Sequence, residues 1–271
     1  MSGIAVQVVA IVLLAPLVQG TMKWLRARWQ GRPGPSPVQP YRDLRKLWGK
    51  EAVLPEGVSV ITAWAPGIVL GVALTFAAML RVGPDRPPVW DAVALVLLLA
   101  LGRFVLALAA LDVRSGFTGM AASREMTFAA LAEPTLLLTL IGGPNLLAFA
   151  ALCLTLLLET ARVPIDNQET HYELTMMHEG LTLEYSGWQL ALVHVAAYVR
   201  QLAFFVLAAA VLAPQGGPAA AAAIVVVLMA AITLTETLFA KVRLFEIPQI
   251  LTSAFILAAT GLALHLAGIG G

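Results

Sequence analysis

Charged residues are scarce in this sequence of 271 residues: 12% are Asp, Glu, Lys or Arg, and 59% are hydrophobic. A water-soluble domain has about 25% charged and about 45–50% apolar residues. The mean hydropathy is +0.85, so the lipid bilayer is the expected solvent for most of the chain. The formal net charge is only +1, which gives no indication of a nucleic-acid partner.

Cysteine is nearly absent. The one cysteine, Cys153, lies inside an apolar run, so no disulfide can form within the chain. An iron–sulfur cluster needs about four ligands, which one thiolate cannot supply. The four histidines do not form a zinc-type pair at helical spacing. We therefore expect this chain to hold no redox metal or other cofactor of its own.

Long apolar runs occupy most of the sequence. A membrane-spanning helix needs about 20 mostly apolar residues, and helices satisfy the backbone hydrogen bonds that lipid cannot. No alternating pattern typical of a barrel is present. The sequence therefore predicts an all-α, polytopic membrane protein in which residues 1–271 form a single membrane domain of about eight transmembrane helices. The expected helices cover residues 3–22, 58–80, 91–111, 126–142, 145–160, 187–213, 218–238 and 249–268.

Two details refine these runs. Residues 4–18 lack a basic n-region and a cleavage site, which favours a retained helix over a signal peptide. The runs 126–142 and 145–160 are short, and Gly142-Gly143-Pro144 between them predicts a tight turn.

Lysine and arginine gather in alternate loops. The loop after the first helix contains Lys23, Arg26, Arg28, Arg32, Arg42, Arg45, Lys46 and Lys50. The third, fifth and seventh loops add Arg114, Arg124, Arg162, Lys241 and Arg243, whereas the opposite side has only Arg81 and Arg86. Because cytoplasmic loops are enriched in positive residues, we expect the odd-numbered loops in the cytoplasm and both termini outside it.

The first basic loop, residues 23–57, has an internal pattern. Residues 31–40 are rich in Pro and Gly and exclude a long helix. Residues 41–50 place Leu44, Leu47 and Trp48 on one face of a helix, which predicts a short amphipathic helix at the membrane interface. Two roles stay open for the basic residues: docking a partner, or setting the topology alone.

Ionisable residues within membrane spans cost at least a few kcal/mol and are usually functional. Those in or beside the apolar runs are Arg103, Asp112, Glu125, Glu133, Glu159, Arg200 and Glu236. We expect His194 and His265 to be packed or interfacial. Glu236 lies near the cytoplasmic end of its run, so a simple charge near the helix end and a relay role are both open.

Glu133 is the clearest candidate for a functional charge within a membrane span, because it precedes Pro134 within an apolar run. Arg124 is nine residues away and therefore does not pair with it along one helix turn. A carboxylate in apolar surroundings is costly to ionise and can exchange a proton near neutral pH. Glu133 is thus either a proton-relay carboxylate or one partner of a structural ion pair with Arg103 or Arg200.

The cytoplasmic acidic loop, residues 159–186, concentrates charge of the opposite sign. Of the 16 acidic residues in the chain, six fall here: Glu159, Asp166, Glu169, Glu173, Glu179 and Glu184. Apolar residues such as Leu174 and Met177 interleave with them, which favours an ordered polar loop over a solvated tail. A solvated loop remains the alternative.

Three stretches together carry a family resemblance. The first contains Arg26, Arg28, Arg32, Pro35, Pro40, Tyr41, Arg42, Asp43, Leu44, Lys46 and Leu47. The second is Ala122-Ser123-Arg124-Glu125, followed by Glu133-Pro134. The third contains Glu159, Arg162, Pro164, Asp166, Glu169, Glu173, Glu184 and Tyr185. With these stretches in this order, the chain resembles the complex I subunit 1 family, the quinone-end membrane subunit of NADH dehydrogenase.

Departures from the complex I pattern indicate the branch. His171 stands where complex I members usually have an acidic residue, and Glu236 where they usually have arginine. The triplets Tyr41-Arg42-Asp43 and Ser123-Arg124-Glu125 resemble the branch found in membrane-bound group 4 [NiFe] hydrogenases, which includes formate hydrogenlyase subunit 4.

The resemblance implies a non-catalytic membrane anchor and ion-path subunit in a prokaryotic cytoplasmic membrane. The residues that match the family's carboxylate path are Glu133, Glu159, Asp166, Glu169, Glu173 and Glu184. To the expected path we add His171, which lies within that series and titrates near neutral pH, and Glu236. Supporting charges would be Arg103, Asp112, Arg124, Glu125, Arg162 and Arg200. The docking surface would contain Arg26, Arg28, Arg32, Arg42, Asp43 and Lys46. Implied partners are [NiFe] hydrogenase-like large and small subunits, an iron–sulfur protein and antiporter-like membrane subunits, with the nickel–iron site and iron–sulfur clusters on those partners.

Two other functions remain open. The chain could be a true quinone-site subunit of complex I, in which case the loop carboxylates would respond to quinone reduction. A stand-alone transporter is the other possibility, although we find no internal repeat of the kind that many transporters have.

Overall fold

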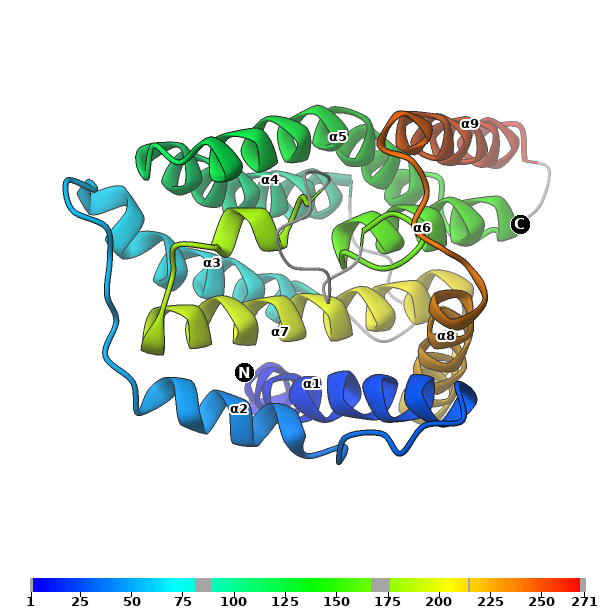
Figure 1. The fold of residues 1–271 in the computed structure, drawn as a ribbon. Coiled ribbons are helices and arrows are strands. Elements are labelled where there is room, and N and C mark those ends of the chain that lie inside the picture. The colour runs from blue at the N-terminus through cyan, green and yellow to red at the C-terminus, as the bar shows by residue number, and fades with distance from the viewer. Residues whose placement is uncertain (1, 81–88, 167–175, 214, 269–271) are drawn as a thin grey trace.

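The structure is a computed structural model that describes residues 2–80, 89–166, 176–213 and 215–268. Within these residues every regular element is a helix, as Figure 1 shows, which confirms the predicted all-α class. The elements are α1 (Ser2–Trp29), α2 (Gln39–Trp48), α3 (Val60–Met79), α4 (Val89–Asp112), α5 (Gly116–Ile141), α6 (Leu146–Glu159), η1 (Glu179–Thr182), α7 (Gly187–Leu212), α8 (Pro218–Leu238), η2 (Leu244–Glu246) and α9 (Ile247–Leu266).

Six of these helices are long and apolar enough to cross a membrane, by length and composition: α1, α3, α4, α7, α8 and α9. The two short runs of the sequence correspond to α5 and α6. α5 has 26 residues but carries Arg124, Glu125 and Glu133, whereas α6 has only 14 residues. At 1.5 Å per residue α6 is about 21 Å long, less than the ~30 Å apolar core of a bilayer. The described chain is therefore multi-pass, with six apolar spans and two atypical helices.

Two helices begin or end elsewhere than the hydropathy pattern predicts. α1 continues to Trp29, so Lys23, Arg26 and Arg28 lie on its last turns rather than in a loop. α5 begins at Gly116, ten residues before the apolar run starts. In its first turns, Ala121 and Ala122 belong to one buried apolar cluster with Leu181 of η1. The turn at residues 142–145 is present as predicted.

Hydrogen bonds bring the odd-numbered loops together at one end of the bundle. The Val53 N–H donates to Ser186 Oγ at 2.8 Å, which joins the first loop to the fifth. The Val242 N–H donates to Pro164 O at 2.9 Å, which joins the seventh loop to the fifth. We name this end the loop face. The first, fifth and seventh loops therefore meet at this end, while the sides of the membrane on which the loops and termini lie stay a prediction.

α7 is the central helix, and it packs against α1, α3, α6 and α8 (Figure 1). Its fully buried Phe204 lies 5.1 Å from the ring of Phe76 in α3, centroid to centroid. α9 packs instead against α5 and α6 at the edge of the bundle. The predicted amphipathic helix corresponds to α2, which begins two residues earlier than predicted and lies against α1 and α7.

Candidate functional site: a buried charge network below the loop face

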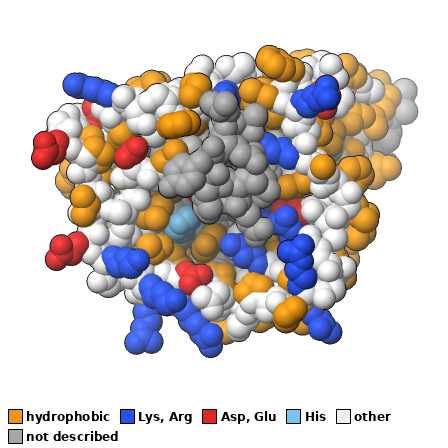
Figure 2. Space-filling model, in the orientation of Figure 1, with side chains coloured by type: hydrophobic (Ala, Val, Ile, Leu, Met, Phe, Trp, Pro, Cys, Tyr) orange, Lys and Arg blue, Asp and Glu red, His pale blue; other side chains and the backbone are white. Residues whose placement is uncertain are grey.

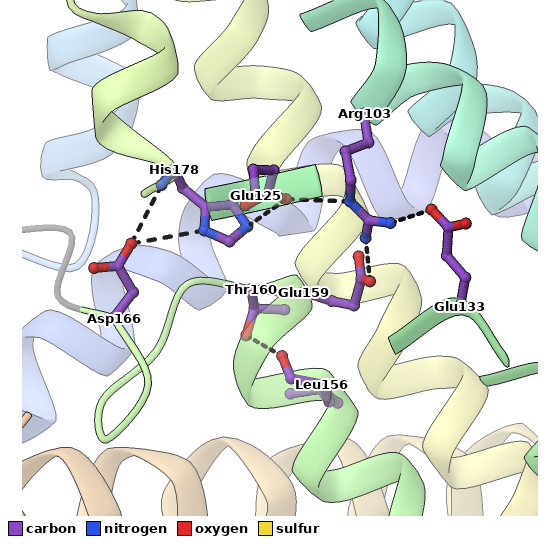
Figure 3. A network of polar contacts seen from close by, with 8 residues as sticks. All are labelled: Arg103, Glu125, Glu133, Leu156, Glu159, Thr160, Asp166 and His178. Carbon is purple, nitrogen blue, oxygen red and sulfur yellow. Dashed lines mark hydrogen bonds and ion pairs between the residues drawn. The ribbon is translucent and has the colours of Figure 1, made fainter. Parts of the chain in front are cut away.

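Arg103, a buried residue of α4, binds three carboxylates. Its Nε donates to Glu125 Oε1 at 3.1 Å, and its two terminal nitrogens donate to Glu133 and Glu159 (Figure 3). Glu125 and Glu133 come from α5, and Glu159 is the last residue of α6. The side chain of Glu133 is 30% exposed, whereas the other three are 3–5% exposed. We name these four residues the Arg103 cluster.

The chain reverses direction directly after Glu159. The Arg162 N–H donates to Leu157 O at 2.9 Å, and the Ala161 N–H donates to Leu158 O at 3.0 Å. This is the Schellman arrangement at a helix C-terminus. Ala161 adopts φ = 52°, a left-handed conformation that costs a non-glycine residue about 1–2 kcal/mol. The turn directs Glu159 and Arg162 into different polar clusters although they are three residues apart.

His178 joins the Arg103 cluster to the loop after α6. Its Nε2 lies 3.4 Å from Glu125 Oε1, and its Nδ1 lies 3.6 Å from Asp166 Oδ2. The His178 backbone N–H also donates to Asp166 Oδ2 at 3.2 Å. Lys241, beyond α8, donates to Asp166 Oδ1 at 2.9 Å. Figure 3 shows the His178 ring between Asp166 and Glu125, so charged side chains form a continuous series from the loop face to Glu133.

The pKa values of the two loop residues reflect these contacts. Burial favours the neutral form of Asp166, but His178 and Lys241 outweigh burial and lower the pKa of Asp166 to about 2. Burial also disfavours the imidazolium of His178. The carboxylates of Glu125 and Asp166 nevertheless raise the pKa of His178 above its ordinary value. His178 is therefore more readily protonated than an exposed histidine.

A cavity of about 50 Å³ lies beside the Arg103 cluster, between α3, α4, α5 and α7. Arg103, Glu125, His178 and Arg200 contribute to its lining. Within the described residues, Arg200 of α7 acts on Glu159 and Glu125 through its charge rather than through a direct ion pair. The rest of the lining is apolar, and the volume is enough for a few water molecules beside these four side chains.

Arg162 organises a second buried cluster on the other side of the turn. Its Nη1 donates to Glu236 Oε1 of α8 at 2.9 Å. Its Nη2 donates to Gln201 Oε1 of α7 at 2.7 Å and to Gln19 of α1. The Gln201 amide in turn donates to Met22 Sδ at 3.0 Å. This Arg162 cluster ties three helices to the loop, and it contains Glu236, which the sequence analysis had placed on the ion path.

Three other predicted residues lie away from both clusters. Asp112 accepts from Ser59 N at 2.6 Å and from Thr62 Oγ1 at 2.5 Å, at the start of α3. Arg124 donates to the carbonyl of Met176 at 3.3 Å. Glu184 is half-buried between η1 and α7.

The remaining predicted residues add no member to either cluster. Glu169, His171 and Glu173 lie outside the described residues, and their roles stay predictions. His194 stacks on Tyr198 within α7, with centroids 6.1 Å apart. His265 is half-buried near the end of α9. Among the described residues, no group of three or more His, Cys, Asp or Glu is placed to hold a metal ion.

The residues predicted to dock a partner gather at one edge of the loop face. Arg28, Arg32, Arg42, Asp43 and Lys46 are exposed, on the last turn of α1, the following loop and α2. Figure 2 shows Lys and Arg side chains along the edge where Figure 1 places α2. We name this the basic edge.

Sequence reasoning missed His178, Lys241, Gln19 and Gln201 as members of the site. Lys241 was noted only as a loop residue and His178 was not singled out, while the two glutamines carry no charge that would indicate a buried polar site in a membrane. For the Arg103 cluster, the sequence did contain a signal that two carboxylates share a partner: the spacing of Glu125 and Glu133. Eight residues is close to two helix turns of 3.6 residues, so both carboxylates face the same neighbour.

The family assignment follows from comparison of the sequence with known proteins. The model of the NADH dehydrogenase family matches residues 2–146 and 143–267. The chain belongs to this family. The predicted resemblance is thereby confirmed.

The related proteins agree with the predicted branch. Formate hydrogenlyase subunit 4 of Escherichia coli (strain K12) is 33% identical over 210 residues, which is 67% of each chain. Hydrogenase-4 component C of the same organism is 32% identical over 231 residues, 75% of this chain and 72% of the relative.

A solved structure shows the same fold. A chain in the membrane-bound sulfane sulfur reductase, an archaeal respiratory membrane complex, superposes with a TM-score of 0.76. The match covers 97% of this chain and 99% of that chain at 18% sequence identity. At this identity, the likeness establishes the fold alone.

Proposed function

We propose that this chain is the membrane anchor and ion-path subunit of a multi-subunit, membrane-bound [NiFe] hydrogenase of the formate hydrogenlyase type. In this proposal the complex lies in a prokaryotic cytoplasmic membrane. Two relatives of about one-third identity, both named as components of such systems, support the assignment. They favour this role over that of a complex I quinone-site subunit, and the nickel–iron site and iron–sulfur clusters would lie on partner subunits.

One observation carries the ion-path role: a single buried arginine is shared by three carboxylates from two helices. Such a group has several alternative pairings. If one carboxylate moves away from Arg103, it becomes a buried unpaired charge, which favours uptake of a proton. Glu159 is placed for this movement because it adjoins the turn into the loop face. Glu133, 30% exposed, is the outward end of the network.

The basic edge supplies the docking surface for the peripheral redox arm in this proposal. A redox change in the arm alters charge or shape at the loop face and shifts the pairing within the Arg103 cluster. This is coupling between two sites through an element with two arrangements. Antiporter-like membrane subunits would receive the ion beyond Glu133.

Co-purification tests the assignment of the complex. A tagged chain isolated from native membranes in mild detergent is expected to bring down a nickel–iron large subunit and an iron–sulfur protein. Recovery of NADH-binding subunits would assign the chain to complex I instead. Isolation of the chain by itself, with solute transport in vesicles, would identify a transporter.

Glu159→Gln tests the ion path in the reconstituted complex. The substitution keeps the size of the side chain and removes the exchangeable charge. We expect ions translocated per redox turnover to fall at least tenfold, whereas the control Glu246→Gln, at an exposed residue of η2, stays within twofold of wild type. An unchanged ratio in Glu159→Gln would remove Glu159 from the path.

A further inference from the structure

His178 occupies a bridging position that the proposed function does not by itself assign. Its two ring nitrogens face different carboxylates, Asp166 on the loop side and Glu125 on the cluster side. His178 thereby connects the Asp166–Lys241 pair to the Arg103 cluster. The histidine therefore lies at the junction between the loop after α6 and the charges within the bundle.

Among the described groups of this network, the formal charges balance only when His178 is protonated. The groups that face it from the packed elements are Glu125, Arg103, Glu159, Arg200, Asp166 and Lys241. Together with Glu133 they comprise four carboxylates and three permanent cations. The network is therefore at −1 with neutral imidazole and at zero with imidazolium.

Two buried atoms at this junction have room for a further proton or hydrogen bond. Glu125 Oε2 and His178 Nδ1 are buried and have no hydrogen-bond partner among the described residues. Both residues line the cavity beside Arg200. The distance of 3.4 Å from Nε2 to Glu125 Oε1 is a few tenths of an ångström longer than a hydrogen bond. Such contacts often tighten only in the working state.

We propose that His178 is the proton-exchanging link between the loop face and the Arg103 cluster. The imidazolium passes the proton on Nε2 to Glu125. An N–H bond breaks, an O–H bond forms and no electrons move. The neutral ring keeps its proton on Nδ1. A rotation of the ring then turns the bare Nε2 from Glu125 toward the loop side, where it takes a proton from water. The proposal rests on the proposed function and names the proton as the ion at this step.

Two variants at His178 test the link in the complete complex, reconstituted in liposomes with a pH-sensitive dye inside. The amide nitrogen of His178→Asn takes about the place of Nδ1 and that of His178→Gln about the place of Nε2, so each keeps one contact. Neither amide exchanges a proton near neutral pH. We expect protons translocated per redox turnover to fall about tenfold or more in both variants. The control His194→Gln, at the half-buried histidine stacked on Tyr198, stays within twofold.

The pH profile separates proton exchange from a merely structural role. The wild-type ratio is expected to decline as alkaline pH deprotonates His178, whereas the residual ratio of the variants stays flat between about pH 6 and 9. A variant profile that keeps the wild-type shape at reduced height would overturn the proposal. So would a wild-type ratio in either folded variant.

Comparison with the Glu159→Gln complex separates failure of the His178 link from failure of the proposed ion-path function. If that complex loses translocation while both His178 variants keep it, the link is wrong and the ion path stands. If all three keep it, the proposed function itself fails.

Discussion

Replacing Arg103 with glutamine is expected to destabilise the bundle far more than any surface substitution. The guanidinium is 4% exposed and is the direct cation partner of two almost fully buried carboxylates, Glu125 and Glu159. Glutamine retains part of the hydrogen bonding but none of the charge. The carboxylates must then take up protons or remain as uncompensated charges in a medium of low dielectric constant.

The magnitude follows from burial. Breaking a buried ion pair by removing one partner costs about 3–5 kcal/mol. Arg45→Gln, at an exposed position of α2, serves as the matched control and should stay within about 0.5 kcal/mol of wild type. Glu159→Gln should cost less in the Arg103→Gln background than in wild type, because its cation is already gone. The expected coupling energy is about 0.5–3 kcal/mol.

The single cysteine provides the assay. Cys153 is half-buried on α6, so labelling of its thiol during titration with sodium dodecyl sulfate follows unfolding of the purified chain and yields its free energy. Equal losses for Arg103→Gln and Arg45→Gln would refute the burial argument. Additive losses in the double variant would show that Arg103 and Glu159 do not interact.

Two further predictions use the same titration. The pKa of Asp166 is lowered to about 2, so its carboxylate contributes stability above the ordinary pKa of about 4 and loses it as pH falls toward 2. Asp166→Asn should therefore cost on the order of 2 kcal/mol at pH 6 and progressively less below pH 5; a cost independent of pH would contradict this. Gly187 adopts φ = 54°, and a Cβ there would lie 2.4 Å from Glu51 O. Gly187→Ala should cost about 1–3 kcal/mol by overpacking, whereas Gly67→Ala, where a Cβ meets nothing within 4 Å, should be neutral or slightly stabilising.

Hydropathy predicted the apolar helices to within a few residues, but it failed where polar residues continue a helix. The basic end of α1 and the first ten residues of α5 are helical, yet no apolar run marks them. Their helical state depends on neighbours. Ala121 is buried against η1, a contact between residues about 60 positions apart in the chain. A local pattern contains no information about such a contact.

The candidate site, like the fold, was predicted only in part from the sequence. Intramembrane charge singled out Arg103, Glu125, Glu133 and Glu159 without any structure. The alternative that pairs Glu133 with Arg103 is present in the structure, whereas Arg200 stands apart from direct ion pairs within the described residues. Hydropathy does not determine the rotation of a helix about its axis, so the sequence left this choice open.

The sequence by itself determined that the chain is helical and membrane-spanning, and to which family it belongs. Each of these follows from composition, from the period of a helix or from ordered motifs along the chain. Only the tertiary structure decided that Glu159 and Arg162 enter separate clusters and that His178 bridges Asp166 to Glu125. Those pairings depend on a left-handed turn at an alanine and on packing between distant segments, and sequence spacing does not specify distances across space.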